Sequence, residues 1–417
     1  MDTTQPASEF LDELAVRGLI HDSTDRADLL EILERPTTCY AGFDPTADSL
    51  HIGHLLGIAS LTRFARAGHR PLALVGSVTG AIGDPSGRST ERNLLDPATI
   101  AANTQAVAMQ LNRLAGCAVV DNATWTTDLD VVSFLRDVGK HFSVNVMLTR
   151  DSVASRLKSG ISFTEFAYQL LQANDFAELF HREGCRLQLG GSDQWGNIVA
   201  GIELIRRTTG ERAAGLTWPL LTRSDGSKFG KSSDGDTIWL SAERTSPFQF
   251  HQHWLRVEDN DVEALLARLT ALDLGAIAET MTTHRANPKA RVAQRRLADE
   301  LTAWVHSFGA CQLASQAAAV LFGDAFPDAD TLASLAGEIP TVEVPSSALT
   351  EGLVALVARS EAASSKNDAR RLLAGGAVSL NGQQVGLDHE LSAADLVGDR
   401  FILVRRGKHE HRLVIVS

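Results

Sequence analysis

The chain has 417 residues, of which 44% are hydrophobic and 22% are charged. This length and composition are those of a globular protein of two to four domains, and they exclude a fibrous or largely disordered chain. The net charge of -12 means that any polyanionic partner has to be met by a local concentration of Lys and Arg.

Targeting and cysteine patterns set further limits. No apolar run approaches the roughly 20 residues that cross a bilayer. The first residues include Asp2, Glu9 and Asp12 and no basic cluster, unlike a secretory signal or a transit peptide. The four cysteines are far apart, which argues against a zinc knuckle or a disulfide framework. We therefore expect a cytoplasmic protein without membrane association.

The first 240 residues alternate between helix and strand patterns. Residues 1–35 have the spacing of an amphipathic helical segment. Residues 36–240 then alternate apolar strand candidates with helical stretches. The strands are predicted at 38–43, 72–75, 118–120 and 186–189, and the helices at 54–67, 97–114, 163–180 and 193–207. Such alternation predicts βαβ units and an α/β domain with a mostly parallel sheet.

The remaining residues divide into three regions. Residues 241–335 are helical throughout, and 336–350 are rich in Pro, Val and Ser, which predicts a mobile linker. Residues 351–417 form a small unit that ends in two predicted strands. From Leu353 onward nine Lys/Arg stand against seven Asp/Glu, so the tail is the basic end of an acidic chain.

Residues 45–54 carry the first chemical motif, Pro-Thr-Ala-Asp-Ser-Leu-His-Ile-Gly-His. It follows a predicted strand and opens a helix, whose N-terminus offers unpaired N–H groups to phosphate. His51 and His54 can donate hydrogen bonds to phosphate oxygens, and Gly53 lets a nucleotide ring lie against the backbone. Taken alone, the motif is equally a helix cap with surface histidines.

Residues 228–232, Lys-Phe-Gly-Lys-Ser, carry the second motif in a Gly-rich loop. Lys228 and Lys231 would make a mobile cationic clamp for a polyphosphate, although a solvated basic turn has the same composition. In this order and within one α/β domain, the two motifs resemble the HIGH and KMSKS signatures of class I aminoacyl-tRNA synthetases. That resemblance implies a Rossmann-like catalytic domain and ATP as a substrate.

One polar helix face indicates which amino acid an enzyme of this class would activate. Tyr168, Gln172 and Asp175 stand at i, i+4 and i+7 and share one face. Together with residues 40–44, 83–87 and 190–197, this face closely resembles bacterial-type tyrosyl-tRNA synthetases over almost the whole chain. The resemblance implies activation of L-tyrosine to tyrosyl-adenylate and its transfer to the 3′ end of tRNA(Tyr) by a homodimer, with 142–148 as a candidate part of the interface.

The resemblance also implies a role for each matching residue. Tyr40 and Asp175 would bind the tyrosine hydroxyl, Asp84, Tyr168 and Gln172 its amino group, and Gln194 would lie near its carboxylate. Asp193 would meet the ribose, and Gly53 and His54 the nucleotide. The pyrophosphate would face Thr46, His51, Arg88, Arg92, Lys228 and Lys231. Asp44 would lie between the two sites. Two positions, Ala41 and Arg88, depart from the residues most frequent in the family.

The reaction itself requires charge and positioning. A tyrosine carboxylate is ionised at pH 7 and attacks the α-phosphate without a general base. The enzyme has to align the reactants and place positive charge where the pyrophosphate departs. We expect Mg²⁺ to arrive with ATP, because no carboxylate cluster in the sequence indicates a dedicated metal site.

The tail supplies the last motif. Residues 364–382 combine a basic helix, a Gly turn and a strand that ends in Asn-Gly. They resemble the S4 RNA-binding module, which implies a small C-terminal α+β domain with Lys366, Arg370 and Arg371 facing the tRNA. A solvated basic helix is the alternative. By the same resemblance, residues 241–335 would form an all-α domain for the anticodon arm.

Three other functions share some of these sequence features. A tryptophanyl-tRNA synthetase shares the fold and both signatures but has no use for Tyr40 and Asp175 aimed at a phenol. A nucleotidylyltransferase needs no RNA-binding tail. An RNA-binding factor with a synthetase fold would not need to keep intact motifs. These arguments favour tyrosine activation.

Overall fold

The computed structural model describes residues 5–84, 86, 95–149, 151–154, 160–222, 229, 236–323, 325–407 and 410–417. They form two compact units. The first contains Met1–Ser241 and Glu258–Ala286, and the second contains Ala242–Val257 and Asn287–Ser417. Each unit holds one five-stranded sheet.

The sheet of the first unit is parallel throughout, in the order β3-β2-β1-β4-β5. Apolar runs that are buried on both faces are typical of such sheets, and β5 is buried along its whole length. Four of these strands are predicted from the sequence pattern, and β5 is not. The strands are β1 (Thr38–Phe43), β2 (Arg70–Val75), β3 (Ala118–Asp121), β4 (Cys185–Gly191) and β5 (Ala214–Trp218).

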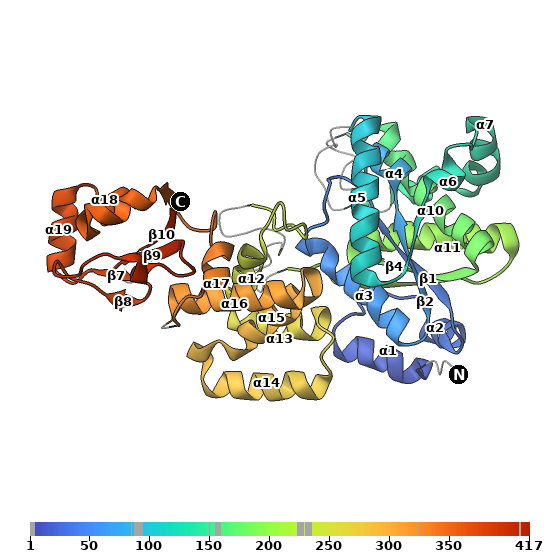
Figure 1. Ribbon diagram of the computed structural model, residues 1–417. Helices are drawn as coiled ribbons and strands as arrows, with labels where there is room; N and C mark the ends of the chain where they lie inside the picture. Colours follow the sequence, from blue (N-terminus) through green and yellow to red (C-terminus); the bar gives the residue numbers. More distant parts are fainter. Residues whose placement is uncertain are drawn as a thin grey trace. The chain divides into compact units, whose positions relative to one another are not determined.

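Helices connect the strands by crossovers. Right-handed crossovers place α3 (Leu55–Arg66) and α5 (Pro97–Ala115) on one face and α10 (Phe163–Glu183) and α11 (Trp195–Thr209) on the other (Figure 1). The sequence marks the ends of α5, because the Asp96 carboxylate caps its N-terminus and Gly116 ends it in the left-handed conformation. The remaining helices before β5 are α1 (Ala7–Val16), α2 (Arg26–Leu33), α4 (Ser77–Ile82), α6 (Ala123–Thr126), α7 (Val131–Ser133), α8 (Val144–Leu148) and α9 (Asp151–Ala154).

Part of the helical region belongs to this first unit. Helices α13 (Asp259–Leu269) and α14 (Leu274–Ala286) follow the sheet in sequence but join its unit. The buried Arg17 and the largely buried Arg63 explain the attachment. Arg17 donates to the carbonyl oxygens of Ala267 and Leu272, and Arg63 of α3 donates to that of Thr270. These bonds satisfy carbonyl groups that the end of α13 leaves unpaired. The expected single helical domain at 241–335 is therefore divided between the two units.

The second unit is built around a mixed sheet in the order β6-β10-β9-β7-β8. Side chains alternate along its strands, so Ile402 and Val404 pack on one face and Phe401 and Leu403 on the other. The first face carries α18 (Leu353–Arg359) and α19 (Lys366–Ala374), and the second carries α16 (Phe308–Phe322) and α17 (Ala329–Ser334). The other elements are α12 (Pro247–Leu255), α15 (Val292–Val305), β6 (Thr341–Val344), β7 (Val378–Leu380), β8 (Gln383–Gln384), β9 (Phe401–Arg406) and β10 (Glu410–Val416).

The segment at 336–350, expected to be a linker, contains a strand of this sheet. Its strand β6 pairs in parallel with β10, and Val344 is buried in the core between the sheet and α18. Strand pairing with the last residues of the chain overrides the Pro- and Ser-rich composition of the segment. The expected architecture of a parallel α/β sheet, a helical region and a C-terminal α+β sheet is confirmed.

Candidate functional site

The candidate site lies where the carboxyl ends of β1 and β4 meet. These two strands are neighbours although they are far apart in sequence, and the strand order changes direction between them. Ligands of open parallel sheets bind in the crevice outside the strand ends at such a point. Asp44 and Thr46 directly follow β1, and Asp193 and Gln194 lie in the short turn that follows β4. Both groups of predicted residues thus come together.

A phenol and a carboxylate are buried at the base of this crevice. Asp175 is 2% exposed and accepts hydrogen bonds from Trp125 Nε1 at 2.8 Å and Asn122 Nδ2 at 3.1 Å. Burial raises the pKa of the Asp175 carboxyl to about 7, against the lowering effect of these two bonds. The hydroxyl of Tyr40 is buried and has no hydrogen-bond partner among the described residues. Burial and the nearby Asp175 charge raise the pKa of Tyr40.

A second carboxylate is connected to the first by hydrogen bonds. Asp44 accepts from the Tyr168 hydroxyl at 3.1 Å and from Thr79 Oγ1 at 3.0 Å. Thr79 Oγ1 in turn accepts from Asn122 Nδ2 at 3.2 Å. This chain of bonds runs from Asp44 to Asp175 through α4 and the end of β3. Gly76 permits it, because a Cβ at this position would overlap both Thr79 Oγ1 and Asp44 Oδ1.

Amide side chains form the second polar group of the site. Gln194 Nε2 donates to Asp84 Oδ2 at 2.7 Å, and Gln172 Nε2 donates to Gln194 Oε1 at 3.2 Å. Asn197 Nδ2 donates to Gln172 Oε1 at 2.7 Å. Asp84, Gln172 and Gln194 are only partly buried, so this group is open to a ligand.

The two histidines of the first motif are held by backbone groups. His51 Nδ1 accepts from Gly53 N at 3.0 Å, and His54 Nδ1 accepts from His51 N at 3.1 Å. A neutral ring that accepts at Nδ1 carries its proton at Nε2, and burial lowers the pKa of His51 in agreement with the neutral form. Gly53 is exposed, and a Cβ there would lie 2.7 Å from His51 Cε1. The orientation of both rings is therefore fixed by backbone N–H groups of the motif itself.

The structure describes only some of the remaining predicted residues. Thr46 and Asp193 are exposed beside the strand ends. Lys366, Arg370 and Arg371 lie exposed on α19 in the second unit. The cationic residues Arg88, Arg92, Lys228 and Lys231, and with them most of the second motif, lie outside the described residues.

Several site residues were missed by sequence analysis. Thr79, Asn122, Trp125 and Asn197 all bond to predicted residues, and Gly76 makes room for them. The sequence contains an indication of two of them, because Asn122 and Trp125 lie within five residues of the end of the predicted strand at 118–120. The carboxyl end of that strand lies at the same edge of the sheet as those of β1 and β4.

The geometry suits a small molecule with two different polar ends. Tyr40 and Asp175 can receive a hydroxyl group in an apolar surrounding, and Asp44, Asp84 and Gln172 can receive an ammonium group. The histidine motif stands at the start of α3, where the positive end of the helix dipole favours a phosphate.

Comparison with known proteins gives consistent matches. A family model described as tRNA synthetases class I (W and Y) matches residues 33–323, and one described as the tyrosine–tRNA ligase SYY-like C-terminal domain matches 331–414. The tyrosine–tRNA ligase of Roseiflexus castenholzii is 47% identical over 97% of this chain and 99% of its own length. That of Geobacillus stearothermophilus is 45% identical with the same coverage.

Solved structures agree with these matches. A C-terminally truncated mitochondrial tyrosyl-tRNA synthetase of Aspergillus nidulans is 32% identical, with a TM-score of 0.68 over 73% of this chain and 92% of that one. A tryptophanyl-tRNA synthetase of Encephalitozoon cuniculi, 13% identical with a TM-score of 0.55 over 72% of this chain and 87% of that one, shares the fold alone.

The buried Asp175 predicts an unusual pH dependence of stability. Its pKa is about 7 in the folded chain against an ordinary 3.8, so the folded state binds an extra proton between about pH 4 and pH 7. Stability therefore falls as the pH rises through this window, and the penalty is complete above pH 7. An uncharged Asp175→Asn side chain avoids it, so we expect a gain of about 2 kcal/mol at pH 8 after the loss of one hydrogen bond.

Thermal denaturation without ligands at pH 8 and pH 5 measures this gain. It should be clear at pH 8 and shrink toward pH 5. The exposed carboxylate variant Asp128→Asn should melt like the wild type at both values. A variant Asp175→Asn that is less stable than the wild type at pH 8 would show that the carboxylate is not penalised by burial.

Proposed function

The chain belongs to the tyrosine–tRNA ligases of the class I tRNA synthetases, and on this basis we propose which of its residues carry the reaction. It joins tyrosine to tRNA with ATP as the energy source. We propose two steps: L-tyrosine attacks ATP to give tyrosyl-adenylate and pyrophosphate, and the tyrosyl group then passes to the 3′ end of tRNA(Tyr). The tryptophanyl alternative has less support, because the tryptophanyl structures share only the fold.

The single observation that carries the choice of tyrosine is the buried Tyr40–Asp175 pair. The substrate hydroxyl would donate to Asp175 and accept from Tyr40, whose own hydroxyl lacks a partner among the described residues. Asn122 and Trp125 hold the Asp175 carboxylate in place. Phenylalanine would leave the pair unsatisfied in a buried site, which costs more than the loss of one hydrogen bond.

The amino group of tyrosine would enter between Asp84, Tyr168 and Gln172, with Gln194 near the carboxylate. These groups bond to one another in the structure, so substrate binding exchanges the Gln194–Asp84 contact for contacts to the ammonium. Asp44 accepts a hydrogen bond from the Tyr168 hydroxyl at 3.1 Å. We propose that Asp44 orients Tyr168 and adds negative charge near the ammonium.

ATP would lie against Gly53 and the start of α3. His54 would contact the nucleotide, Asp193 its ribose, and Thr46 and His51 the phosphates, where their donors oppose the growing charge of the leaving pyrophosphate. Arg88, Arg92, Lys228 and Lys231 would supply the cations. No group of three or more potential metal-ligating side chains was found among the described residues. We propose that Mg²⁺ arrives bound to ATP.

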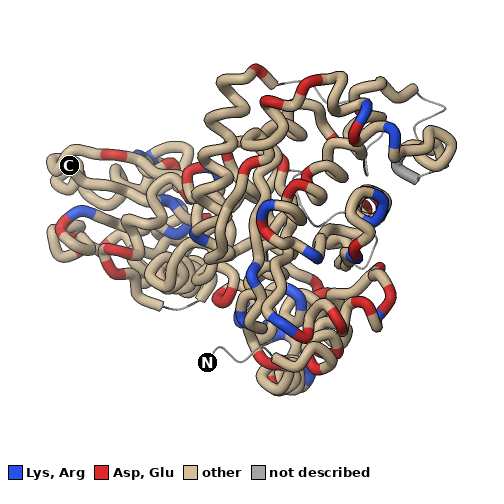
Figure 2. The backbone as a smooth tube through the Cα atoms, turned by 90° about the vertical axis from the view of Figure 1, so that its right-hand side faces the viewer, with Lys and Arg blue, Asp and Glu red and all other residues tan. Residues whose placement is uncertain are grey.

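Transfer RNA would bind the second unit through α19. Lys366, Arg370 and Arg371 are exposed there, and the Arg371 side chain is 79% exposed in its ion pair with Asp368. Basic and acidic positions are interspersed along the described backbone (Figure 2), so the attraction has to come from such local groups. No helix in the described ranges is long and apolar enough to span a bilayer. We propose a cytoplasmic location because protein synthesis consumes the product there.

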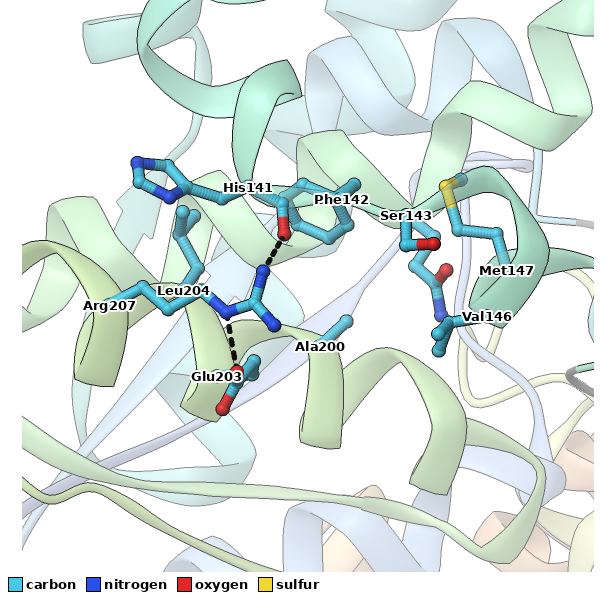
Figure 3. Close-up of a pocket in the computed structure, with 10 residues that line it drawn as sticks. His141, Phe142, Ser143, Val146, Met147, Ala200, Glu203, Leu204 and Arg207 are labelled. Carbon is cyan, nitrogen blue, oxygen red and sulfur yellow. Dashed lines mark hydrogen bonds and ion pairs between the residues drawn. The ribbon is translucent and has the colours of Figure 1, made fainter.

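We also propose that two copies associate through the first unit. Between residues 131 and 163 the side chains of Val131, Val132, Leu135, Val144, Val146 and Phe163 are all more than half exposed. Arg207 of α11 holds the neighbouring segment by donating to the His141 carbonyl at 2.6 Å and to Glu203, beside a cavity of about 70 Å³ (Figure 3). Val144 and Val146 are therefore held on the surface, where a second copy would cover them.

Amino-acid selectivity tests the tyrosine pocket. Replacing Asp175 with Ala should lower the ratio of kcat/KM for tyrosine over phenylalanine by about 10- to 100-fold, since a hydrogen bond to a charged group is lost. Pyrophosphate exchange into ATP with each amino acid measures the ratio. The variant Thr124→Ala alters an exposed neighbour of the pocket residues and should keep it. An unchanged ratio in Asp175→Ala would refute the assignment.

Salt dependence tests the RNA surface. A triple variant with Ala at 366, 370 and 371 should keep pyrophosphate exchange but bind tRNA more weakly. The slope of log K against log salt should become shallower by about 2 to 3, since three phosphate contacts are removed. Substitutions suit this test better than truncation near Pro340, because the lost strands would expose the apolar face of α16 and α17.

The control for this measurement is a triple Ala variant of exposed arginines in the first unit, at Arg182, Arg186 and Arg212. This control variant should reduce the slope of log K against log salt by less than the α19 variant does. Equal slopes for the wild type and the α19 variant would place the tRNA elsewhere.

Sedimentation or light scattering tests the assembly. The wild type should have twice the mass of one chain at micromolar concentration, and Phe163→Asp should lower it to a single chain by placing a charge in the apolar contact. Phe163 is 76% exposed and Phe308 of the second unit 71%, so Phe308→Asp is a matched control that should stay dimeric. A monomeric wild type would rule the dimer out.

A further inference from the structure

Ser49 is a buried residue within the first motif, and its side chain connects three separate parts of the first unit. The residue is 4% exposed. Its hydroxyl donates to the Leu50 carbonyl at 2.8 Å and accepts from Gln110 Nε2 at 3.0 Å and from the Ser241 amide at 3.1 Å. One hydroxyl group therefore joins the first motif to α5 and to the segment at 238–241, which follows the second motif in sequence.

The backbone on both sides of His51 pairs with this segment. The carbonyl group before His51 accepts from the Leu240 amide at 2.8 Å, and the amide group after His51 donates to the Ile238 carbonyl at 3.0 Å. His51 and Trp239 therefore stand opposite one another in an antiparallel bridge. Their rings meet edge to face with centroids 6.0 Å apart. Because His51 Nδ1 also accepts from the Gly53 amide, both the backbone and the ring of His51 are held.

Helix α5 supports the loop at 45–50 from the other side. Gln110 Oε1 accepts from the Leu50 amide at 2.8 Å. Asn103 stands about two turns before Gln110 on the same face of α5, and its Nδ2 donates to the Pro45 carbonyl at 3.1 Å. These two amide side chains hold both ends of the loop. Ser49 lies where this support meets the segment at 238–241, so its hydroxyl connects the two.

We propose that Ser49 is a positioning residue for the departure of pyrophosphate and that it acts through His51. This inference rests on the proposed function, in which His51 donates a hydrogen bond to the phosphates. A donor stabilises the growing charge of the leaving group best when it is already in place. Without the Ser49 hydroxyl, the donors of Gln110 and Ser241 lose an acceptor and the pairing beside His51 loosens. The displaced ring then costs more in the transition state than in bound ATP.

A matched pair of serine variants tests this role in the full chain. Ser49→Ala should lower the rate constant for tyrosyl-adenylate formation on the order of tenfold and change the Kd of ATP by less than about twofold. Ser60→Ala is the control, because Ser60 is also 4% exposed but donates to the Leu56 carbonyl within its own helix α3. The control should keep the rate constant. Equal rate constants for the two variants would overturn the inference.

A double-mutant cycle with His51→Ala separates this inference from the proposed function. Addition of Ser49→Ala to His51→Ala should lower the rate constant by less than about twofold further, because no ring is left to position. Losses that multiply fully would show that Ser49 acts elsewhere. A wild-type rate constant in His51→Ala would instead refute the proposed role of His51 at the phosphates.

Trp239 tests the same bridge from its other strand and leaves the hydrogen bonds of Ser49 in place. Trp239→Leu should lower the rate constant about fivefold, whereas Trp239→Phe keeps a ring beside His51 and should stay within about twofold of the wild type. Melting temperatures show whether each variant is folded at the assay temperature. If Ser49→Ala is not, the Trp239 pair decides the question, and equal rate constants for its two members would overturn the positioning of His51 by this bridge.

Discussion

The burial of the Asp175 carboxylate is the constraint on which the rest of the candidate site depends. A charged group in an apolar interior is unstable unless donors surround it. Trp125 and Asn122 provide those donors, and Asn122 also bonds to Thr79, which bonds to Asp44. The tight turn at Gly76 and the start of α4 are arranged around this chain of bonds. If Asp175 binds the substrate hydroxyl as proposed, the pocket loses folding stability in exchange for the recognition of that group.

The parallel sheet brings these groups together without any local signal. Its order places β1 beside β4, so residues near position 44 meet residues near position 194. The same edge of the sheet also ends β3, and Asn122 and Trp125, which follow that strand, therefore reach Asp175 there.

The C-terminal unit shows how a sheet with two apolar faces determines which helices pack against it. Ile402 and Val404 require α18 and α19 on one face, while Phe401 and Leu403 require α16 and α17 on the other. The basic helix α19 is thereby fixed to a sheet that includes β6. The composition of residues 336–350 predicted a mobile linker, but pairing of β6 with β10 gives these residues backbone partners. Local composition could not reveal a partner more than 60 residues away.

The sequence alone determined the α/β class and the tyrosine–tRNA ligase family, because periodic burial and motif spacing are local properties. Tyr40, Asp175 and the two histidines could be named from such patterns. Only the tertiary structure decided the roles of Thr79, Asn122 and Trp125, the division of the helical region and the strand within the expected linker. Each of these depends on hydrogen bonds or packing between distant segments, such as Arg63 with the carbonyl of Thr270. A sequence pattern records which faces are apolar, whereas the partner of a buried polar group is settled only when the chain has folded.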